Sequence, residues 1–593
     1  MENNRSKLLW ISFLTLVAAG IGFATRGAAG GAWADEYGIS SGQFGGIMGA
    51  GFLGFGFVIF FGGIVVEALG YKKVLILAIV LHLISAAMLL ITPSLYSGWV
   101  ESSPDTATDS TVNFLTYSVF LFSICAGLYE AVINPLVGQI YPEDQTHYLN
   151  VLHAGWPGGL IVGGIFAYLF QNSDAVISEV PWHIALASFS LVLIYLLMLT
   201  LKEEFPATVS EGSDEGMGAA FVCFASAPFL LLIVLHGLIG YMELGVDSWQ
   251  TRLMENLVEN SVIVLIYTSF LMFGLRFFAG PIVHKINPIG LLLISSVLAV
   301  LGLLALGADT DSVMIIFAAA TLYSLGKAFL WPTMLAVAGE RYPRSGAVAM
   351  GALGASGMIV VGFIGGPAIG VKQAKSTSAH LENADAAVYE RYLSEEDGDF
   401  YGLISYKQLD SAKQQAALEL KYDEEGQVEA DSLAKQQTSI TESTAIDDAA
   451  KAILIDNLAA DGKVVQSSYN SGGRRALRLT AYVPAGMTVG FLILLLYYKS
   501  IGGYKVLSLA DDGSGDDAGG DSAEATGITE SAPEVPAAEA PADNPADGVA
   551  DGGEAEADDG DDEAPAAEDT ADEGAADEGA GEAADDSAEE SDD

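Results

Sequence analysis

Glu130-Ala-Val-Ile-Asn134-Pro135 and Lys327-Ala-Phe-Leu-Trp331-Pro332 are two copies of one pattern, a charged residue followed by proline inside an apolar segment. The same number of residues separates Glu130 from Lys327 and Pro135 from Pro332. Each copy is followed by Tyr-Pro, at 141–142 and 342–343, and then by a glycine-rich stretch, at 155–159 and 354–357. An ordered series of this kind predicts two homologous halves.

Apolar segments fill most of the chain on both sides of this pattern. About 20 apolar residues cross a bilayer core as a helix, and polar or turn residues separate twelve segments of that kind. The predicted spans are 8–28, 44–66, 73–92, 114–140, 148–170, 181–201, 219–244, 262–283, 289–308, 313–338, 346–370 and 477–498. The sequence therefore predicts an all-α polytopic membrane protein with two pseudo-symmetric six-helix bundles.

The spans divide the chain into bundles and connecting segments. The predicted parts are a six-helix bundle at 1–205, a linker at 206–218, helices 7–11 at 219–371, an insertion at 372–476, helix 12 at 477–500 and an acidic tail at 506–593. The insertion is rich in Ala, Gln and Glu. We expect it to form a small helical cap, with disorder as the alternative.

Charged residues in short loops predict the orientation. Lys and Arg gather on the side of both termini, whereas the short loops of the other side hold essentially Arg252 alone. Positively charged loops stay in the cytoplasm. Arg474, Arg475 and Arg478 end the insertion and argue the other way, but the rule weakens for such long segments. We expect a multi-pass protein of the plasma (inner) membrane with both termini cytoplasmic and the insertion outside.

Composition sets the tail apart from the rest of the chain. The chain combines 51% hydrophobic residues with a formal net charge of −49. Because a soluble protein would not combine these two values, the apolar residues and the negative charge must lie in different segments. From Ala510 to Asp593 there are 32 Asp or Glu residues and no Lys or Arg. Self-repulsion and low hydrophobicity predict that this tail does not fold.

The motifs of enzymes are missing from the sequence. Cys125 and Cys223 are the only cysteines, and each lies in an apolar run, so no disulfide framework or cysteine metal site is expected. Phosphate-binding, hydrolase and zinc-protease motifs are absent as well. We expect no enzymatic activity, no catalytic residue, no cofactor, no metal and no nucleic-acid partner.

Gly63-Ile-Val-Val-Glu67-Ala-Leu-Gly70-Tyr-Lys72-Lys73, after the second span, resembles the signature loop of the major facilitator superfamily, with Glu67 in the position of its acid. Glycines let helices approach, and the acid and the basic pair can cap helix ends. The second half keeps a degraded copy from Gly274 to Pro281, in which we expect Arg276 to be a structural residue of the loop. The resemblance implies the fold of that superfamily, with a solute site between the two halves.

Asn134-Pro135, the following Leu149-Asn150 and the glycine-rich fifth span resemble the sugar-proton symporter branch that includes fucose permease. That resemblance implies a proton-coupling role for Glu130. Arg26 departs from the pattern, because it stands near the place of an Asp in the branch, and a permanent cation cannot carry a proton as an acid does.

Four ionisable residues lie inside spans that the resemblance places around a central cavity: Arg26, Glu130, Glu243 and Lys327. A charge within a span is costly and normally faces a partner or a wet cavity. With a rise of about 1.5 Å per residue, Glu130 and Lys327 lie at comparable depth. One hypothesis pairs these two across the halves, and the alternative ties each charge within its own half.

Asn134, Trp156, Tyr241 and Tyr323 lie close to these charges in sequence and are candidates to contact solute, since sugar sites combine aromatic faces with polar groups. We expect a secondary transporter, a monomer in the lipid bilayer, that moves a small polar solute by alternating access. A sugar or polyol carried with a proton is the first expectation. An organic or inorganic anion transporter and a non-transporting membrane sensor or scaffold with an acidic tail are the alternatives.

Overall fold

The computed structural model describes residues 2–39, 41–170, 181–187, 189–209, 218–249, 262–310, 312–423, 425–443 and 446–507. All of them belong to one compact unit. Most of the predicted linker, at 210–217, and the predicted acidic tail from residue 508 onward lie outside the described residues.

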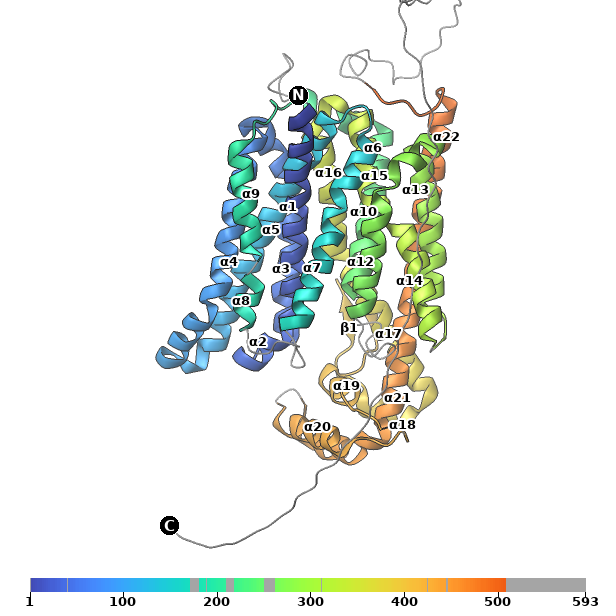
Figure 1. Ribbon diagram of the computed structural model, residues 1–593. Coiled ribbons are helices and arrows are strands. Elements are labelled where there is room, and N and C mark those ends of the chain that lie inside the picture. The colour runs from blue at the N-terminus through green and yellow to red at the C-terminus, as the bar shows by residue number, and fades with distance from the viewer. Residues whose placement is uncertain are drawn as a thin grey trace, which may run out of the picture. The chain divides into compact units, whose positions relative to one another are not determined.

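The first half is a bundle of long apolar helices with short helices at their ends (Figure 1). Its elements are α1 (Glu2–Ala28), α2 (Gly30–Tyr37), α3 (Ser41–Leu69), α4 (Tyr71–Ser102), η1 (Pro104–Thr106), α5 (Ala107–Ile140), α6 (Gln145–His153), α7 (Gly155–Phe170), α8 (Trp182–Ala187) and α9 (Ser190–Lys202).

The second half repeats this arrangement, with two short π-helical segments, η3 and η5, in its long helices. Its elements are η2 (Ala219–Ala225), α10 (Ala227–Gly240), η3 (Tyr241–Gly245), α12 (Val262–Arg276), α13 (Ala279–Leu306), α14 (Val313–Lys327), α15 (Leu330–Arg341), η4 (Pro343–Ser345), α16 (Gly346–Val360), η5 (Val361–Gly365), α17 (Gly366–Ala384), α21 (Asp448–Thr480) and α22 (Tyr482–Ser500).

Ten helices within the described ranges are long and apolar enough to cross a membrane. The other two predicted spans, the sixth and the eighth, contain the apolar helices α9 and α12, of 13 and 15 residues. Residues outside the described ranges adjoin both spans. The structure is thus consistent with twelve spans, and the predicted all-α fold class is confirmed.

The predicted turn between the eighth and ninth spans, at 284–288, coincides with an interruption of α13. Asn287, just before Pro288, has φ 57° and ψ 166°, and proline keeps the residue before it out of the helical region. A second, earlier break separates α12, which ends at Arg276, from α13, which begins at Ala279. Arg276 thus stands at the end of α12.

Glycines set the distance between neighbouring helices. A Cβ on Gly159 of α7 would lie 2.3 Å from the carbonyl oxygen of Val17 in α1, within the first half. A Cβ on Gly63 of α3 would lie 2.8 Å from the carbonyl oxygen of Ala347 in α16, which belongs to the other half. Only glycine permits such backbone contact between spans.

The insertion folds as a small helical unit at the end of the bundle opposite the N-terminus (Figure 1). Between α17 and α21 it holds α18 (Ala386–Tyr392), the antiparallel strands β1 (Gly398–Phe400) and β2 (Ile404–Tyr406), α19 (Ser411–Leu418) and α20 (Ala430–Glu442). α17 runs unbroken from Gly366 to Ala384 and α21 from Asp448 to Thr480, so both helices continue across the predicted bounds of the insertion at 372 and 476. The two long helices thus carry the insertion away from the bundle.

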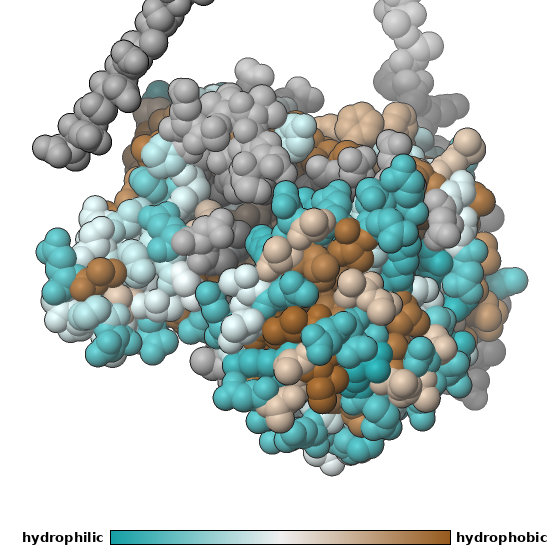
Figure 2. Space-filling model, turned by 90° about the horizontal axis from the view of Figure 1, so that it is seen from below, coloured by the Kyte–Doolittle hydropathy of each residue, from teal (hydrophilic) through white to brown (hydrophobic). Residues whose placement is uncertain are grey.

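The insertion has an apolar core of its own, which includes Leu381, Tyr392 and Leu458. The Arg391 guanidinium also donates two hydrogen bonds to the Asp461 carboxylate, at 2.9 and 2.5 Å. These hydrogen bonds raise the pKa of Arg391 above its usual value. Figure 2 looks onto this end of the molecule, where hydrophilic residues surround smaller apolar groups.

Candidate functional site

Arg276 is buried between the two halves and binds three acceptors. Its Nε donates to the carbonyl oxygen of Ala328 at 2.8 Å, and one terminal nitrogen donates to the carbonyl oxygen of His153 at 2.5 Å. The other terminal nitrogen donates to Glu243 Oε1 at 3.2 Å. Glu243 and Ala328 belong to the second half and His153 to the first, so this one side chain connects the halves.

Prolines explain why two backbone carbonyls accept from Arg276. A helical N–H normally donates to the carbonyl four residues earlier, and proline has no N–H to donate. Pro332 therefore leaves the carbonyl of Ala328 without its helical donor, and Pro157 does the same for His153. Within a membrane a vacated carbonyl needs an internal donor, and Arg276 supplies it in both places.

Lys327 forms the second ion pair of the site. Its ammonium group donates to both carboxylate oxygens of Asp247, at 2.5 and 2.6 Å, and its side chain is fully buried. It also lies 5.1 Å from the ring centroid of Tyr323. Asp247 follows Glu243 by one helical turn, so both carboxylates project from the same stretch of the seventh span.

Glu130 lies in the first half and belongs to no Lys or Arg ion pair within the described ranges. Its Oε2 accepts a hydrogen bond from Asn134 Nδ2 at 2.6 Å, and Asn134 Oδ1 lies 2.9 Å from His153 Nε2. The same His153 nitrogen is 3.9 Å from Glu130 Oε2. Glu130 thus reaches Arg276 through His153. We call Glu130, Glu243, Asp247, Arg276 and Lys327 the central charge cluster.

The hypothesis of a direct Glu130–Lys327 pair is wrong for this structure. Lys327 pairs with Asp247 of its own half, because Asp247 places both oxygens within hydrogen-bond distance of the ammonium group. Asp247 was missed since it lies beyond the predicted end of the seventh span at 244. Its spacing of four residues from Glu243 was the signal that could have identified it.

Arg276 was expected to be a structural residue of the degraded loop, and its hydrogen bonds to two backbone carbonyls are contacts of a structural kind. The expectation did not include its place between the halves, where the side chain is 2% exposed. Arg276 is the residue through which the cluster connects both halves.

Arg26 lies apart from the cluster, inside the first half. Its terminal nitrogens donate to the carbonyl of Gly22 at 2.8 Å and to Ser85 Oγ at 3.0 Å, and its guanidinium lies 4.1 Å from the ring centroid of Phe122. It is fully buried, and no carboxylate pairs with it among the described residues. Cation–π contact therefore takes the place of a counter-ion.

The aromatic candidates have separate surroundings. Tyr323 donates to the carbonyl of Met242 at 2.9 Å and packs beside Lys327, so it adjoins the cluster. Tyr241 accepts a hydrogen bond from Lys372 of α17 at 2.8 Å. Trp156 of α7 is half-buried and packs on the ring of Phe23 with centroids 5.5 Å apart.

The loop-motif residues bring three elements together near the N-terminal end of the bundle. Gly63 contacts α16, Gly70 has φ 85°, and the Glu67 carboxylate lies near Gly346 at the start of α16. Lys72 donates to the carbonyls of Leu201 and Glu203 at 3.0 and 2.8 Å, so it caps the end of α9. Lys73 is exposed.

A second polar contact joins the halves at this same end. Thr146 of α6 donates to Glu340 Oε1 of α15 at 2.6 Å, and Tyr504 donates to Glu340 Oε2 at 2.6 Å. Burial, together with the nearby Glu340 carboxylate, raises the pKa of the Tyr504 hydroxyl, so Tyr504 stays protonated as the donor. The segment after α22 is thereby attached to the contact between the halves.

Two helical halves that meet around a buried set of charges are typical of an α-helical membrane carrier. The sequence pattern of the Major Facilitator Superfamily matches residues 11–366, and the chain belongs to this superfamily. The predicted resemblance to the superfamily is confirmed. No curated protein sequence matches the chain.

Several solved structures are similar in fold. The proton:xylose symporter XylE aligns with a TM-score of 0.52 at 14% identity over 62% of this chain and 89% of its own. The E. coli fucose:proton symporter FucP aligns with a TM-score of 0.45 at 17% identity over 64% and 93%. The human organic anion transporter MFSD10 gives 0.46 at 16% identity over 61% and 92%. At these identities the similarity concerns the fold.

Proposed function

We propose that the chain is a secondary active transporter that moves a sugar or polyol together with a proton by alternating access. The observation that carries this proposal is the central charge cluster. It connects the halves through Arg276 and leaves Glu130 outside its ion pairs. A xylose symporter with the same fold is consistent with this chemistry.

The pairing of the two cations of the central charge cluster favours a neutral solute over an anion. Lys327 is held by Asp247 and Arg276 by Glu243, all within the second half. An anionic solute would have to displace these carboxylates, whereas a hydroxylated neutral solute can hydrogen-bond to the cluster without breaking an ion pair.

Glu130 is the residue that we propose carries the proton. Protonating Glu243 or Asp247 would break an ion pair, but protonating Glu130 breaks none. Its neighbour within ion-pair distance is His153, whose backbone carbonyl accepts a hydrogen bond from Arg276. A change in the charge of Glu130 can thus reach the contact between the halves through one residue.

Alternating access requires a contact that can open between the halves. The hydrogen bond from Arg276 to His153 is such a contact, because the other two acceptors of Arg276 move with its own half. The Thr146–Glu340 hydrogen bond is a second one, at the N-terminal end of the bundle. We further propose that the protein acts as a monomer in the plasma membrane with both termini cytoplasmic and the insertion outside.

Uptake into reconstituted vesicles tests the function. Purified protein would be assayed with labelled D-xylose, L-fucose, D-glucose and glycerol under an inward proton gradient, with and without a protonophore. One pH unit can drive about tenfold accumulation for one proton per solute. We expect accumulation that the protonophore abolishes.

Glu130→Gln tests the assigned role. The variant should still exchange labelled for unlabelled solute but should no longer accumulate it, because the gradient has no proton carrier. Glu101→Gln makes the same chemical change at an exposed position of α4 and should accumulate normally. Full accumulation by Glu130→Gln would rule out its coupling role, and no uptake of any test solute by the unmodified protein would rule out the solute class.

A further inference from the structure

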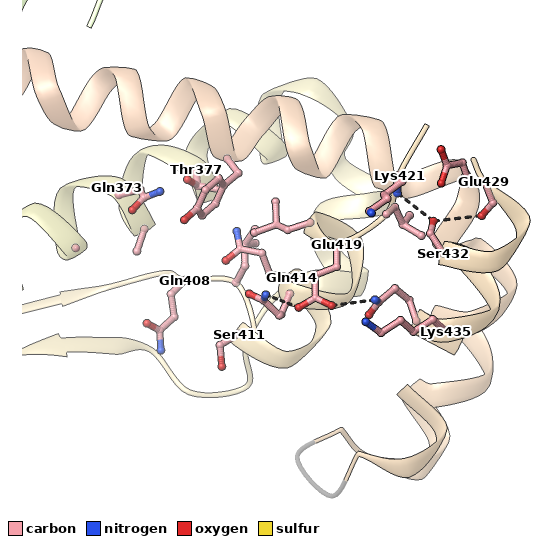
Figure 3. Close-up of a pocket in the computed structure, with 18 of the residues that line it drawn as sticks. Gln373, Thr377, Gln408, Ser411, Gln414, Glu419, Lys421, Glu429, Ser432 and Lys435 are labelled. Atoms are coloured by element: carbon pink, nitrogen blue, oxygen red, sulfur yellow. Dashed lines mark hydrogen bonds between the residues drawn. The ribbon is translucent and has the colours of Figure 1, made fainter. Parts of the chain in front are cut away.

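The insertion forms an open cavity of about 1110 Å³, and none of the residues of the central charge cluster lines it. Its walls are formed by α17, α19 and α20 (Figure 3), together with Tyr469 of α21 and Trp249 at the end of the seventh span. Small-molecule sites typically occupy roughly 300–1,000 Å³. The cavity therefore has room for a small molecule larger than a single sugar ring.

Amides and hydroxyls dominate the lining. Five glutamines contribute to it, together with Thr377, Ser411 and Ser432: Gln373, Gln408, Gln414, Gln415 and Gln436. Each glutamine amide offers two donors and an acceptor oxygen, and each hydroxyl can donate and accept. A solute that both donates and accepts hydrogen bonds around its surface matches such walls.

Gln373 provides the strongest sign of an unfilled site. It lies on α17, is 4% exposed and lines the cavity, yet its Nε2 has no hydrogen-bond partner within the described part of the chain. Leaving a buried amide donor unpaired costs about 1–3 kcal/mol. A ligand oxygen in the cavity would satisfy this donor.

Glu419 presents a fixed acceptor on the opposite wall. Its Oε1 accepts from Gln415 Nε2 at 2.7 Å and its Oε2 from Gln436 Nε2 at 2.9 Å (Figure 3). Both oxygens keep a further lone pair, and the two amides hold the carboxylate in place. A ligand hydroxyl could donate to it without any rearrangement.

The charged and aromatic residues that line the cavity indicate which class of ligand it would bind. Glu419, Glu429 and Asp431 outnumber Lys421 and Lys435, so an anion is not favoured. Trp249 and Tyr469 add aromatic faces, and such faces beside amides and carboxylates suit the C–H surface and hydroxyls of a carbohydrate. We propose that this cavity is a second binding site, for a neutral mono- or disaccharide, at the mouth of the transport pathway.

The choice of a sugar rests on the proposed function, and the site deepens it. Trp249 follows Asp247 by two residues, and α17 continues the eleventh span, so a sugar bound here lies directly beyond the end of the seventh and eleventh spans. The site would collect solute from dilute surroundings and deliver it to the bundle.

Binding to the full-length protein in lipid nanodiscs tests the proposal without any transport step. D-glucose, D-xylose and maltose would be titrated by calorimetry into the Lys327→Met variant, whose central cluster is disrupted, and into the same variant carrying Gln373→Leu or Glu419→Ala. We expect both added substitutions to weaken binding at least tenfold. Gln427→Leu in the Lys327→Met background removes an exposed amide of the same insertion and should leave binding unchanged.

Two readouts keep the proposals apart. Circular dichroism establishes whether the variants with Gln373→Leu and Glu419→Ala fold. Because the two substitutions lie on opposite walls of the cavity, one folded variant is enough for the test. The second site is supported if both the Gln373→Leu and the Glu419→Ala variants lose sugar binding while the unmodified protein shows normal uptake. Three outcomes overturn the second site. Sugar affinity is unchanged by both Gln373→Leu and Glu419→Ala, or the Lys327→Met variant binds no sugar, or it binds acetate more tightly than any sugar. Absence of uptake with intact cavity binding contradicts only the transport proposal.

Discussion

Replacing Arg276 by methionine removes a buried side chain that connects the halves, while keeping the apolar contact of its stem. Glu243 would lose its counter-ion, which stands 3.2 Å away, and both groups are nearly fully buried. Removing one partner of a buried ion pair costs about 3–5 kcal/mol. The carbonyls of His153 and Ala328 would lose a donor as well, and each buried unsatisfied group costs about 1–3 kcal/mol. We expect Arg276→Met to be among the most destabilising single changes in the bundle.

A double-mutant cycle separates the charge from the carbonyls. Glu243→Gln neutralises the orphaned carboxylate, so the double variant should be more stable than Arg276→Met alone, with a coupling energy of about 1–3 kcal/mol. Denaturant unfolding in mixed micelles, followed by circular dichroism, measures each free energy. Lys7→Met breaks an exposed pair with Glu203 and should change stability by less than about 1 kcal/mol.

The outcome that would refute this reasoning is additivity. If the two single changes add within about 0.5 kcal/mol, Arg276 and Glu243 are not interacting. A stable Arg276→Met protein would likewise show that the vacated carbonyls find other donors, and that the connection between the halves does not depend on this residue.

Two further changes test the packing of the bundle and of the insertion. Gly159→Ala should lower stability by about 1–3 kcal/mol, because the new Cβ would stand 2.3 Å from a backbone oxygen of α1. Gly486→Ala is the control, since no atom lies within 4 Å of its new Cβ, and it should be tolerated. Thermal unfolding of the two purified variants compares their stability. Arg391→Met leaves the buried Asp461 without its donors and should lower the stability of the insertion by about 1–3 kcal/mol. The loss should appear as faster proteolysis within the insertion than in the bundle. Lys407→Met, which breaks an exposed ion pair, should not change the rate of proteolysis.

The sequence identifies the parts of the fold that local patterns encode. Long apolar segments define the spans, and the repeat of Glu130 and Pro135 at Lys327 and Pro332 defines the two halves. Both patterns can be found in the linear sequence, the second by comparing two distant segments, so neither requires knowledge of packing. The charges at 130, 243 and 327 are also evident, since a charged residue inside a span demands an explanation.

Partners between helices are harder to predict from the sequence. The sequence analysis offered Glu130 and Glu243 as acids inside spans, but Lys327 binds Asp247. This partner depends on the rotation of the seventh span and on how far that helix continues past its apolar part. Asp247 lies in that continuation, where hydropathy no longer marks the helix. The same difficulty affects Arg276, because the loop motif does not show which carbonyls and which carboxylate its guanidinium contacts.

The prolines nonetheless carry a signal that could have led to Arg276. Each proline inside a span vacates the carbonyl four residues before it, and the membrane interior offers no water to replace the missing donor. Side chains with several N–H groups are rare inside spans, and an arginine has five. Matching the carbonyls vacated by Pro157 and Pro332 against the few available donors points to one arginine that serves both halves. A proline and an arginine in different spans can therefore encode a contact that neither apolar length nor periodicity reveals.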